Sequence, residues 1–357
     1  MSKLSGKIVS ELHLQAISRI IQKRQQKNDS TPELAFFLVG DRVDSRLYVD
    51  IKKKMCDRVG IHYREHVLPE NVSCQQLAEK IQVCNKDSAV DGIIIQLPLP
   101  DHLPEESLLQ MVDPDKDVDG FHSINIARLV SRPVMDSSEI SEIFEEYHGD
   151  RVNGDGDSSE VAKECSDENK IQCIQKSIIN TSRTERGFYP CTPKGIVTLL
   201  DYYCVSQQSK KAVIVGCGRV GRPLGLMLLA RGMTVSYLDR HSRKIDKIKK
   251  VREADVLVVA VGIRGIIDSN WIGSDTVVVD VGIHQTESGK TVGDLVLKDL
   301  LENTKTGRVT GVRRTPVPGG VGPMTVSMLL ENTLISWVRT LEKNKEYSDN
   351  SNVLFAN

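Results

Sequence analysis

The amino-acid sequence predicts an α/β protein with parallel sheets, because short apolar runs alternate with segments of helical spacing along most of the chain. Residues 34–39, 91–97 and 211–215 are three such runs, and each is followed directly by a glycine or a proline. Strands that alternate with helices form parallel sheets joined by right-handed crossovers. The chain has 357 residues, and single cores stop growing at roughly 250–300 residues, so two domains are expected.

The first half of the chain contains the alternation in its simplest form. Apolar residues at helical spacing indicate helices, and short apolar runs closed by glycine or proline indicate buried strands. We predict a helix over 4–22, a strand over 34–39, a helix over 45–59 closed by Gly60, a strand over 61–68, a helix over 74–85 and a strand over 91–97.

The second half resumes the alternation at Tyr189. Its first helix has a proline in the first turn, where the missing N–H costs nothing. The predicted elements are a helix over 193–203, strands over 211–215, 234–239, 255–261 and 276–281, a helix over 221–230, and a long closing helix over 325–341.

The segment 131–187 interrupts this rhythm. Between Asp136 and Lys170 it carries twelve Asp or Glu residues against three Lys or Arg residues. Such a composition buries too little apolar surface to offset the entropy of ordering, so we expect an acidic, largely mobile insertion with one short helix over 140–147. A solvated loop is the simpler interpretation, and a regulatory or partner-binding arm is the alternative. Residues 346–357 are expected to form a flexible tail.

Composition and charge exclude several classes of protein. The net charge is −1 and aromatic residues make up 4%, which disfavours nucleic-acid binding. No apolar run reaches eighteen residues, and the N-terminus lacks a signal peptide's apolar region, so we expect neither membrane association nor export. The eight cysteines show no C-x-x-C pair and no zinc-like spacing, so we expect reduced thiols, no metal and a cytoplasmic location.

A glycine-rich loop follows the predicted strand 211–215 and opens a helix. It reads Gly216-Cys217-Gly218-Arg219-Val220-Gly221, the G-x-G-x-x-G pattern of dinucleotide-binding domains. Gly216 permits the tight turn, Gly218 lets the backbone approach a pyrophosphate, and Gly221 allows close packing of the helix. The free N–H groups of the helix N-terminus favour the phosphates. We therefore predict a Rossmann-type domain.

The end of the next predicted strand leaves the identity of the cofactor open. Asp239 occupies the position at which an acidic residue accepts hydrogen bonds from a ribose 2′-hydroxyl, which favours NAD. The following residues, Arg240, His241, Ser242 and Arg243, are able to hold a 2′-phosphate, which favours NADP.

Polar residues that suit catalysis occur at three places in the first half. Ser45, Tyr48 and Lys52 are spaced to share one face of a helix, and a buried lysine beside a cationic ligand can act as a proton shuttle. Taken alone, a solvated run at 52–54 and a packed tyrosine are the simpler interpretation. Gln96 follows a predicted strand, where open α/β sheets bind ligands, and Asp119 lies with Asp117 in the loop 116–120.

Together these motifs resemble the bifunctional methylenetetrahydrofolate dehydrogenase/methenyltetrahydrofolate cyclohydrolase family over nearly the whole chain except the insertion. The matching motifs are Ser-x-x-Tyr-x-x-x-Lys at 45–52, Gln-Leu-Pro-Leu at 96–99, Lys-Asp-Val-Asp-Gly at 116–120, Pro-Cys-Thr-Pro-Lys-Gly at 190–195, Val-Gly-Asp at 292–294 and Pro-Val-Pro-Gly-Gly-Val-Gly-Pro-Met-Thr at 316–325.

The resemblance implies two α/β domains flanking a cleft. A folate-binding catalytic domain would span 1–130 and be completed by 316–345, and the Rossmann domain would span 188–315. It also implies oxidation of 5,10-methylenetetrahydrofolate to the methenyl cation, followed by hydrolysis to 10-formyltetrahydrofolate, and a homodimer. The alternatives are an enzyme with dehydrogenase activity alone and an inactive folate- or nucleotide-binding protein.

The resemblance also assigns roles to individual residues. Lys52 would be the general acid/base, Gln96 would orient it, Tyr48 would stack on the folate, and Asp119 would bind the pterin. Further contacts with the substrate would come from Ser45, Leu97, Pro98, Pro318, Gly319, Gly320 and Val321. Further contacts with the cofactor would come from the loop 216–221, Asp239, His241, Ser242, Gly262, Ile283 and Thr325.

The sequence departs from the family at the cofactor site. The family's phosphate loop usually reads Gly-Arg-Ser-x-x-Val-Gly, whereas here Gly216 to Gly221 is one residue shorter and lacks the Arg-Ser pair. The family's Cys-His-Ser after the next strand survives only as His241-Ser242. Because these two residues and Arg243 suit a phosphate, NADP is the favoured cofactor and NAD the alternative.

Overall fold

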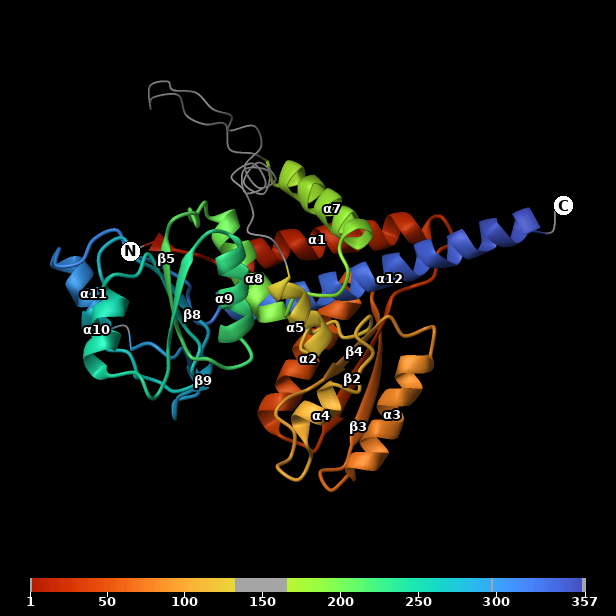
Figure 1. The fold of residues 1–357 in the computed structure, drawn as a ribbon, viewed down its shortest axis with the longest axis horizontal. Helices are drawn as coiled ribbons and strands as arrows, with labels where there is room; N and C mark the ends of the chain where they lie inside the picture. Colours follow the sequence, from red (N-terminus) through yellow and green to blue (C-terminus); the bar gives the residue numbers. More distant parts are fainter. Residues whose placement is uncertain (1, 132–165, 297, 355–357) are drawn as a thin grey trace. The chain divides into compact units, whose positions relative to one another are not determined.

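The computed structural model describes residues 2–131, 166–296 and 298–354 (Figure 1). The helix expected over 140–147 lies outside these residues, as does most of the expected insertion. The chain divides into two compact units. The first comprises Met1–Glu11, Leu129–Lys170 and Thr192–Thr325, and the second comprises Leu12–Arg128, Ile171–Cys191 and Val326–Asn357.

The first unit contains a six-stranded sheet in the order β1-β11-β8-β7-β5-β6, in which every pairing is parallel. Strand β5 lies between β6 and β7, so the chain leaves β5 towards one side for β6 and returns to the other side for β7. Ligands bind at such a switch point, outside the carboxyl ends of the strands. The strands are β1 (Ser2–Lys3), β5 (Lys211–Val215), β6 (Thr234–Leu238), β7 (Val256–Val259), β8 (Val277–Asp280) and β11 (Arg313–Arg314), and a small antiparallel pair comprises β9 (His284–Gln285) and β10 (Thr291–Val292).

Runs of β-branched residues explain the central strands of this sheet. Strands β7 and β8 read VLVV and VVVD and are buried throughout, as expected for parallel strands covered on both faces. The remaining elements of the second half are α8 (Cys191–Tyr202), α9 (Gly221–Ala230), α10 (Lys244–Arg252), the short 3-10 helix η1 (Ser269–Trp271), α11 (Lys298–Lys305) and α12 (Val321–Leu354).

The second unit contains a three-stranded parallel sheet in the order β3-β2-β4. Its strands are β2 (Glu33–Val39), β3 (His62–Leu68) and β4 (Gly92–Ile95). Helix α3 (Cys74–Lys86) begins with a capping box between Ser73 and Gln76, and α2 (Val43–Val59) ends at Gly60 in the left-handed conformation. The other helices of the first half are α1 (Gly6–Gln25), α4 (Glu105–Leu109) and α5 (Ser123–Val130).

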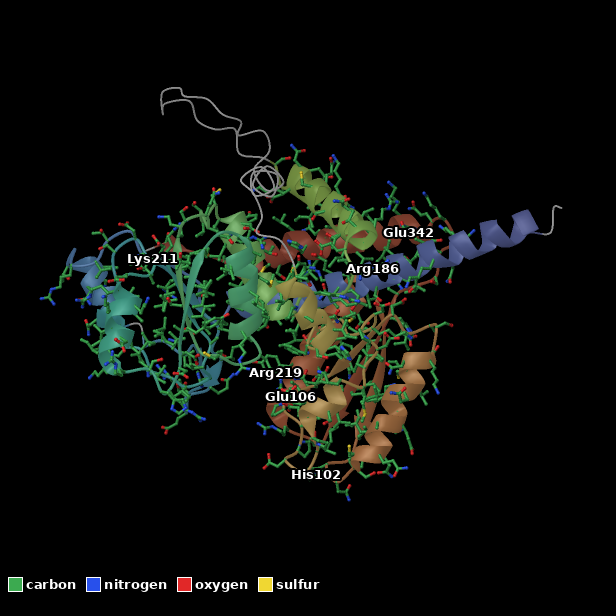
Figure 2. The ribbon with its side chains drawn as sticks, viewed as in Figure 1. His102, Glu106, Arg186, Lys211, Arg219 and Glu342 are labelled. Carbon is green, nitrogen blue, oxygen red and sulfur yellow. The ribbon has the colours of Figure 1, made fainter. Side chains whose placement is uncertain are left out.

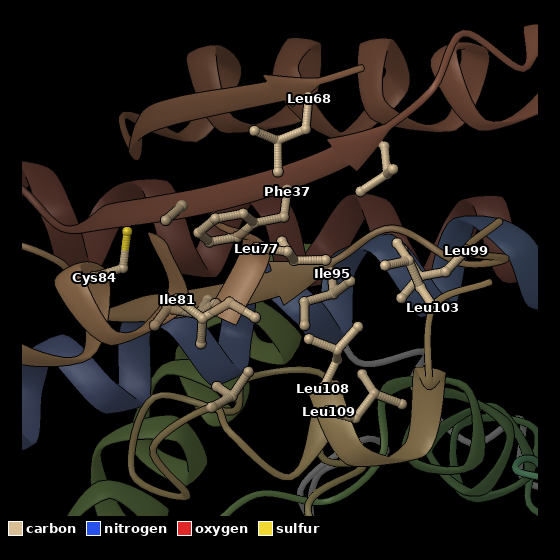
Figure 3. Packing of buried hydrophobic residues seen from close by; sticks show 14 of the residues in the cluster. Phe37, Leu68, Leu77, Ile81, Cys84, Ile95, Leu99, Leu103, Leu108 and Leu109 are labelled. Atoms are coloured by element: carbon tan, nitrogen blue, oxygen red, sulfur yellow. The ribbon is translucent and has the colours of Figure 1, made fainter. Parts of the chain in front are cut away.

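One face of this sheet packs against α3 and the segment around α4. Phe37 and Ile95 from the sheet meet Leu77 and Ile81 from α3, and Leu108 closes the cluster (Figure 3). These side chains are nearly or fully inaccessible to solvent. Burial of such side chains contributes about 1.5–3 kcal/mol each, so this core holds the carboxyl end of β4, and Gln96 after it, in place.

The α/β class and the expected elements of both halves are confirmed, with shifts of a few residues at their ends. Two segments differ from expectation. Helix α7 (Asp167–Thr184) buries Ile171, Ile174 and Ile178, so the prediction of a mobile segment was wrong for these residues. The composition of the whole segment is dominated by the acidic residues before α7, so the three isoleucines, spaced by three and four positions, were overlooked. Helix α12 continues to Leu354, through most of the expected tail.

The expected domain boundaries differ from the two units at both ends of the chain. Residues 1–11 and 316–325 belong to the unit with the six-stranded sheet, because β1 pairs with β11 and Lys7 N donates to Gly319 O at 3.0 Å. Residues 326–345 belong to the second unit.

Candidate active site

Helix α2 brings Ser45, Tyr48 and Lys52 to one face, as their spacing predicts. Ser45 is buried, and Tyr48 and Lys52 are half-buried, whereas Lys54 on the same helix is exposed. The run 52–54 is therefore not a uniform solvated face, because its first and last lysines lie in different environments. This removes the simpler interpretation of Lys52.

Lys52 contacts Gln96, the residue that follows β4. Lys52 Nζ donates a hydrogen bond of 2.9 Å to Gln96 Oε1. The glutamine is itself fixed, because its Nε2 donates to Leu97 O at 2.9 Å and its backbone N donates to Phe37 O at 2.8 Å. With Nε2 engaged, Oε1 is the atom that faces the lysine.

Burial lowers the pKa of Lys52, while the nearby charge of Asp119 acts in the opposite direction. The pKa of Asp119 is raised, again by burial, against the opposing effects of Lys52 and of a hydrogen bond from Cys191. Strong desolvation together with a charged partner is typical of catalytic groups. The neutral amine of Lys52 therefore forms at a lower pH than that of an ordinary lysine.

The loop that carries Asp119 is held on both sides. The Asp117 carboxylate accepts hydrogen bonds from Gly120 N, His122 N and Asn125 Nδ2, at 3.2, 2.7 and 2.9 Å. On the other side Cys191 N donates to Asp119 O at 3.2 Å. Asp117 therefore shapes the loop, and Asp119 is the carboxylate of the pair that lies near Lys52.

Asn332, to which no role was assigned from the sequence, closes this arrangement. Its Nδ2 donates to Val118 O at 2.8 Å and to Tyr189 O at 3.0 Å, which ties α12 to both segments around Asp119. Asn332 lies three positions from Leu329 and from Ile335 in a predicted helix, so it shares their apolar face, where a polar group needs partners. That signal was present, but a single sequence does not name the partners.

In the first unit the glycine-rich loop has the conformation that its pattern predicts. Gly216 has φ +112°, and a side chain there would collide with Ala260 O. A side chain at Gly221 would collide with Gly216 O, whereas nothing lies within 4 Å of the same position on Gly218. The open side of Gly218 leaves room for a pyrophosphate, so this cradle fits a dinucleotide. Cys217 and Arg219 lie in the same loop, before α9. Arg219 is labelled in Figure 2.

At the end of β6 the Asp239 carboxylate organises its own turn. Its Oδ1 accepts hydrogen bonds from His241 N, Ser242 N and Ser242 Oγ, at 3.0, 2.9 and 2.9 Å. These bonds lower the pKa of Asp239, with that from the Ser242 hydroxyl the largest cause. Arg243 Nε donates to Asp246 Oδ2 at 2.7 Å in an exposed pair. Asp239, which would favour NAD, therefore lies in the same turn as His241 and Ser242, which would favour NADP.

The Val-Gly-Asp motif supports the loop after β7. Asp294 Oδ2 accepts hydrogen bonds from Val261 N and Gly262 N, at 3.0 and 3.1 Å, and its Oδ1 contacts His284 Nε2 at 2.7 Å. Asp294 is fully buried, whereas Gly262 and Ile283 are exposed. The buried Asp294 therefore fixes the backbone at Gly262 and contacts the residue after Ile283, and both Gly262 and Ile283 are expected cofactor contacts.

The glycine-proline motif forms the turn into α12. Gly319 has φ +100°, a conformation that favours glycine. Gly320 and Val321 are buried, and Pro318 is exposed. Thr325 shares a hydrogen bond of 3.0 Å with Thr192.

Comparison with known proteins gives the family. Residues 4–119 match the model of the tetrahydrofolate dehydrogenase/cyclohydrolase catalytic domain. Residues 190–341 match that of the tetrahydrofolate dehydrogenase/cyclohydrolase NAD(P)-binding domain. The chain belongs to the tetrahydrofolate dehydrogenase/cyclohydrolase family.

Individual relatives agree with this assignment. The chain is 38% identical to the bifunctional protein FolD of Neisseria gonorrhoeae over 333 residues, which cover 93% of this chain and 95% of that protein. The Campylobacter jejuni FolD methylenetetrahydrofolate dehydrogenase/cyclohydrolase is 33% identical, with a TM-score of 0.74 and coverage of 94% of this chain and 98% of that one. The Trypanosoma brucei FolD, solved with NADP and an inhibitor, is 26% identical, with a TM-score of 0.73 and coverage of 96% and 98%.

The predicted family, the two-domain α/β architecture and the enzyme class are therefore confirmed. The chain is an enzyme of the tetrahydrofolate dehydrogenase/cyclohydrolase family and has an NAD(P)-binding domain. No helix in the described ranges is both long and apolar enough to cross a membrane.

Proposed function

We propose that this chain oxidises 5,10-methylenetetrahydrofolate to 5,10-methenyltetrahydrofolate and then hydrolyses that product to 10-formyltetrahydrofolate. The observation that carries the proposal is the hydrogen bond between Lys52 Nζ and Gln96 Oε1, formed beside Asp119, where burial lowers the pKa of Lys52 and raises the pKa of Asp119. A bound nicotinamide would supply the acceptor for the hydride that leaves the methylene carbon. No protein acid or base is needed for that transfer, only positioning of the reacting carbons.

Lys52 performs the proton transfers of the hydrolytic step. Its neutral amine accepts a proton from the water that attacks the methenyl carbon, and the new C–O bond removes the positive charge. The same group then returns that proton to the ring nitrogen as the C–N bond breaks, while the hydroxyl of the adduct loses its proton to solvent and becomes the carbonyl of the formyl product. A lowered pKa makes the neutral amine available near neutral pH.

Neighbouring residues bind and orient the folate. The Tyr48 ring stacks on its fused rings, and the Asp119 carboxylate accepts hydrogen bonds from the pterin's amino and ring N–H groups. Ser45, Leu97 and Pro98 complete the pterin side. The resemblance to the family implies that Pro318, Gly319, Gly320 and Val321 contact the benzoyl portion.

We favour NADP as the cofactor. The carboxylate of Asp239 is engaged by the turn that it organises, which supports a structural role for this residue. The Arg243–Asp246 pair is exposed, and such pairs contribute little, so Arg243 is available to a 2′-phosphate together with His241 and Ser242. The loop 216–221 would hold the pyrophosphate, and Gly262, Ile283 and Thr325 would contact the nicotinamide half.

We also propose a cytoplasmic homodimer. The seven cysteines among the described residues are all free thiols, which suits a reducing compartment. The resemblance to the family supports the dimer. Sedimentation of the purified chain measures its oligomeric state, and a monomer at all concentrations would contradict the proposal.

Absorbance spectroscopy tests the proposed reaction. Purified protein is mixed with methylenetetrahydrofolate and either NADP or NAD, and the methenyl and reduced-nicotinamide bands are followed. We expect both bands to rise with NADP and the methenyl band then to decay. A stable methenyl band would indicate an enzyme with dehydrogenase activity alone, and the absence of both bands would indicate an inactive binding protein.

A further inference from the structure

The first unit contains a cavity of about 360 Å³ at the carboxyl edge of β8 and beside β11 and β1. None of the residues of the glycine-rich loop 216–221 lines it, and neither do residues 239–243. It is therefore separate from both expected phosphate contacts of the cofactor. The turn Pro316–Pro318 forms part of its wall.

The charged residues of this wall are strongly biased towards one sign. Four cationic side chains line the cavity, and Asp280 is the one carboxylate among its lining residues; the cations are Lys3, Arg264, Lys290 and Arg314. They come from β1, the loop after β7, the turn before β10, and β11, so the fold collects them from four distant places in the sequence. A concentration of like charge in a concave site raises the local concentration of counter-ions.

None of the four cations forms an ion pair with the part of the protein that the structure describes, although the charge of Asp280 acts on Arg314 from beyond ion-pair distance. Asp280 is instead occupied by the backbone, because it accepts hydrogen bonds from Gly282 N, Asp294 N and Leu295 N, at 3.1, 2.9 and 3.1 Å. The cationic surplus therefore faces the cavity.

Arg314 gives an independent sign that the cavity receives an anion. Its Nε is buried and has no hydrogen-bond partner among the described residues, while Nη1 donates to Thr315 O at 3.3 Å. A buried charged donor without an acceptor is costly, and each such group in a native protein calls for an explanation, of which a bound ion is one. Arginine presents several donors in a fixed fork that matches carboxylates and phosphates.

We propose that this cavity binds a small oxyanion with two or more negative charges, held by Arg314 with Lys3, Arg264 and Lys290. Two sources carry this chemistry. One is a free anion such as phosphate. The other is the substrate itself, because a folate carries a glutamate beyond its benzoyl ring, and the wall of the cavity includes Pro318 from the segment proposed above to line that ring.

Direct binding to the full chain tests the site without reference to catalysis. Isothermal titration with inorganic phosphate and with tricarballylate, at constant ionic strength, is carried out on the wild type and on Arg264→Ala. Arg264 is exposed, so its removal leaves the core intact. We expect removal of one charged contact to weaken binding by about tenfold. Phosphate bound at the glycine-rich loop is unaffected by this change.

Arg308→Ala is the matched control, because Arg308 is an exposed arginine of the same unit that does not line the cavity. It should bind both anions as the wild type does. Failure of the wild type to bind either anion would overturn the proposal. Equal weakening in Arg264→Ala and Arg308→Ala would also overturn it, because the effect would then be that of net charge.

A kinetic arm distinguishes the two sources and rests on the proposed function. Methylenetetrahydrofolate with one glutamate is compared with forms that carry several γ-linked glutamates. If the tail is the ligand, added glutamates lower KM in the wild type and in Arg308→Ala but not in Arg264→Ala. If the ligand is a free anion, KM is independent of glutamate number while phosphate still binds. Both results support the site, and the titration stands even if the chain shows no folate chemistry.

Discussion

Lys52 and Gln96 are 44 positions apart in the chain, yet Lys52 Nζ lies 2.9 Å from Gln96 Oε1. Lys52 lies on helix α2, and Gln96 is the residue that follows strand β4. The glutamine is held at its backbone and at Nε2, so the amine has a fixed acceptor. From this pair we predict how the hydrolytic activity responds to mutation and to pH.

The pH dependence of hydrolysis should reflect the lowered pKa of Lys52. The direction follows from burial, which disfavours the protonated amine. Because the neutral amine is the active base, the rate should rise with pH and level off below the ordinary pKa of lysine, near 10.4. The rate of methenyltetrahydrofolate hydrolysis as a function of pH measures this, after subtraction of the uncatalysed rate. A rate that rises only at the pKa of a free lysine would contradict the account.

Two substitutions of Gln96 should move that profile in opposite directions. Gln96→Glu places a negative charge beside the amine, which raises the pKa of Lys52 and shifts the profile to higher pH. Gln96→Leu removes the acceptor, which lowers the pKa and leaves the amine unoriented, so kcat should fall by about tenfold or more. KM should change less than kcat in both variants. Shifts in the same direction would show that Gln96 acts only through packing.

The turn after β6 should decide between NADP and NAD. Asp239→Asn removes the negative charge but keeps an oxygen that accepts from His241 N and Ser242 N. The ratio of kcat/KM for NADP to that for NAD should rise by about tenfold, since a like charge near a phosphate is unfavourable. Glu253→Gln, which removes an exposed negative charge at the other end of α10, is the control and should leave the ratio unchanged. An unchanged ratio in Asp239→Asn would place Asp239 away from the ribose.

Helix α7 should contribute to stability. Ile174 is buried on its apolar stripe, so Ile174→Ala should lower the free energy of unfolding by about 2–4 kcal/mol. Lys176→Ala, at an exposed position of the same helix, should change it by less than about 0.5 kcal/mol. Denaturant unfolding measures both. Equal small effects would mean that α7 is not packed in solution.

The sequence was sufficient for the elements and for most of the site because both depend on local patterns. Apolar runs closed by glycine located β2, β5, β7 and β8, and the spacing of Ser45, Tyr48 and Lys52 identified one helix face. The glycine pattern at 216–221 anticipated the positive φ of Gly216. These features depend on a few neighbouring residues, so they are visible without the tertiary structure.

The features that could not be predicted depend on contacts between distant segments. Asn332 supports the Asp119 loop from a helix more than two hundred positions away, and the cations of the cavity come from four separate segments. Helix α7 was missed because a charge-rich stretch preceded its apolar stripe. Long-range pairing leaves no periodic signal in a single sequence, so only the fold reveals these groups.

Hydrolysis of methenyltetrahydrofolate by Lys52→Met, measured beside Lys54→Met and with thermal unfolding of both, tests whether Lys52 is the catalytic base. Lys54 is exposed on the same helix and should be dispensable. We expect Lys52→Met to lose nearly all of the hydrolytic rate while it unfolds as cooperatively as the wild type. If Lys52→Met hydrolysed the substrate at the rate of Lys54→Met, or lost activity only in proportion to lost folded protein, Lys52 would not be the catalytic base.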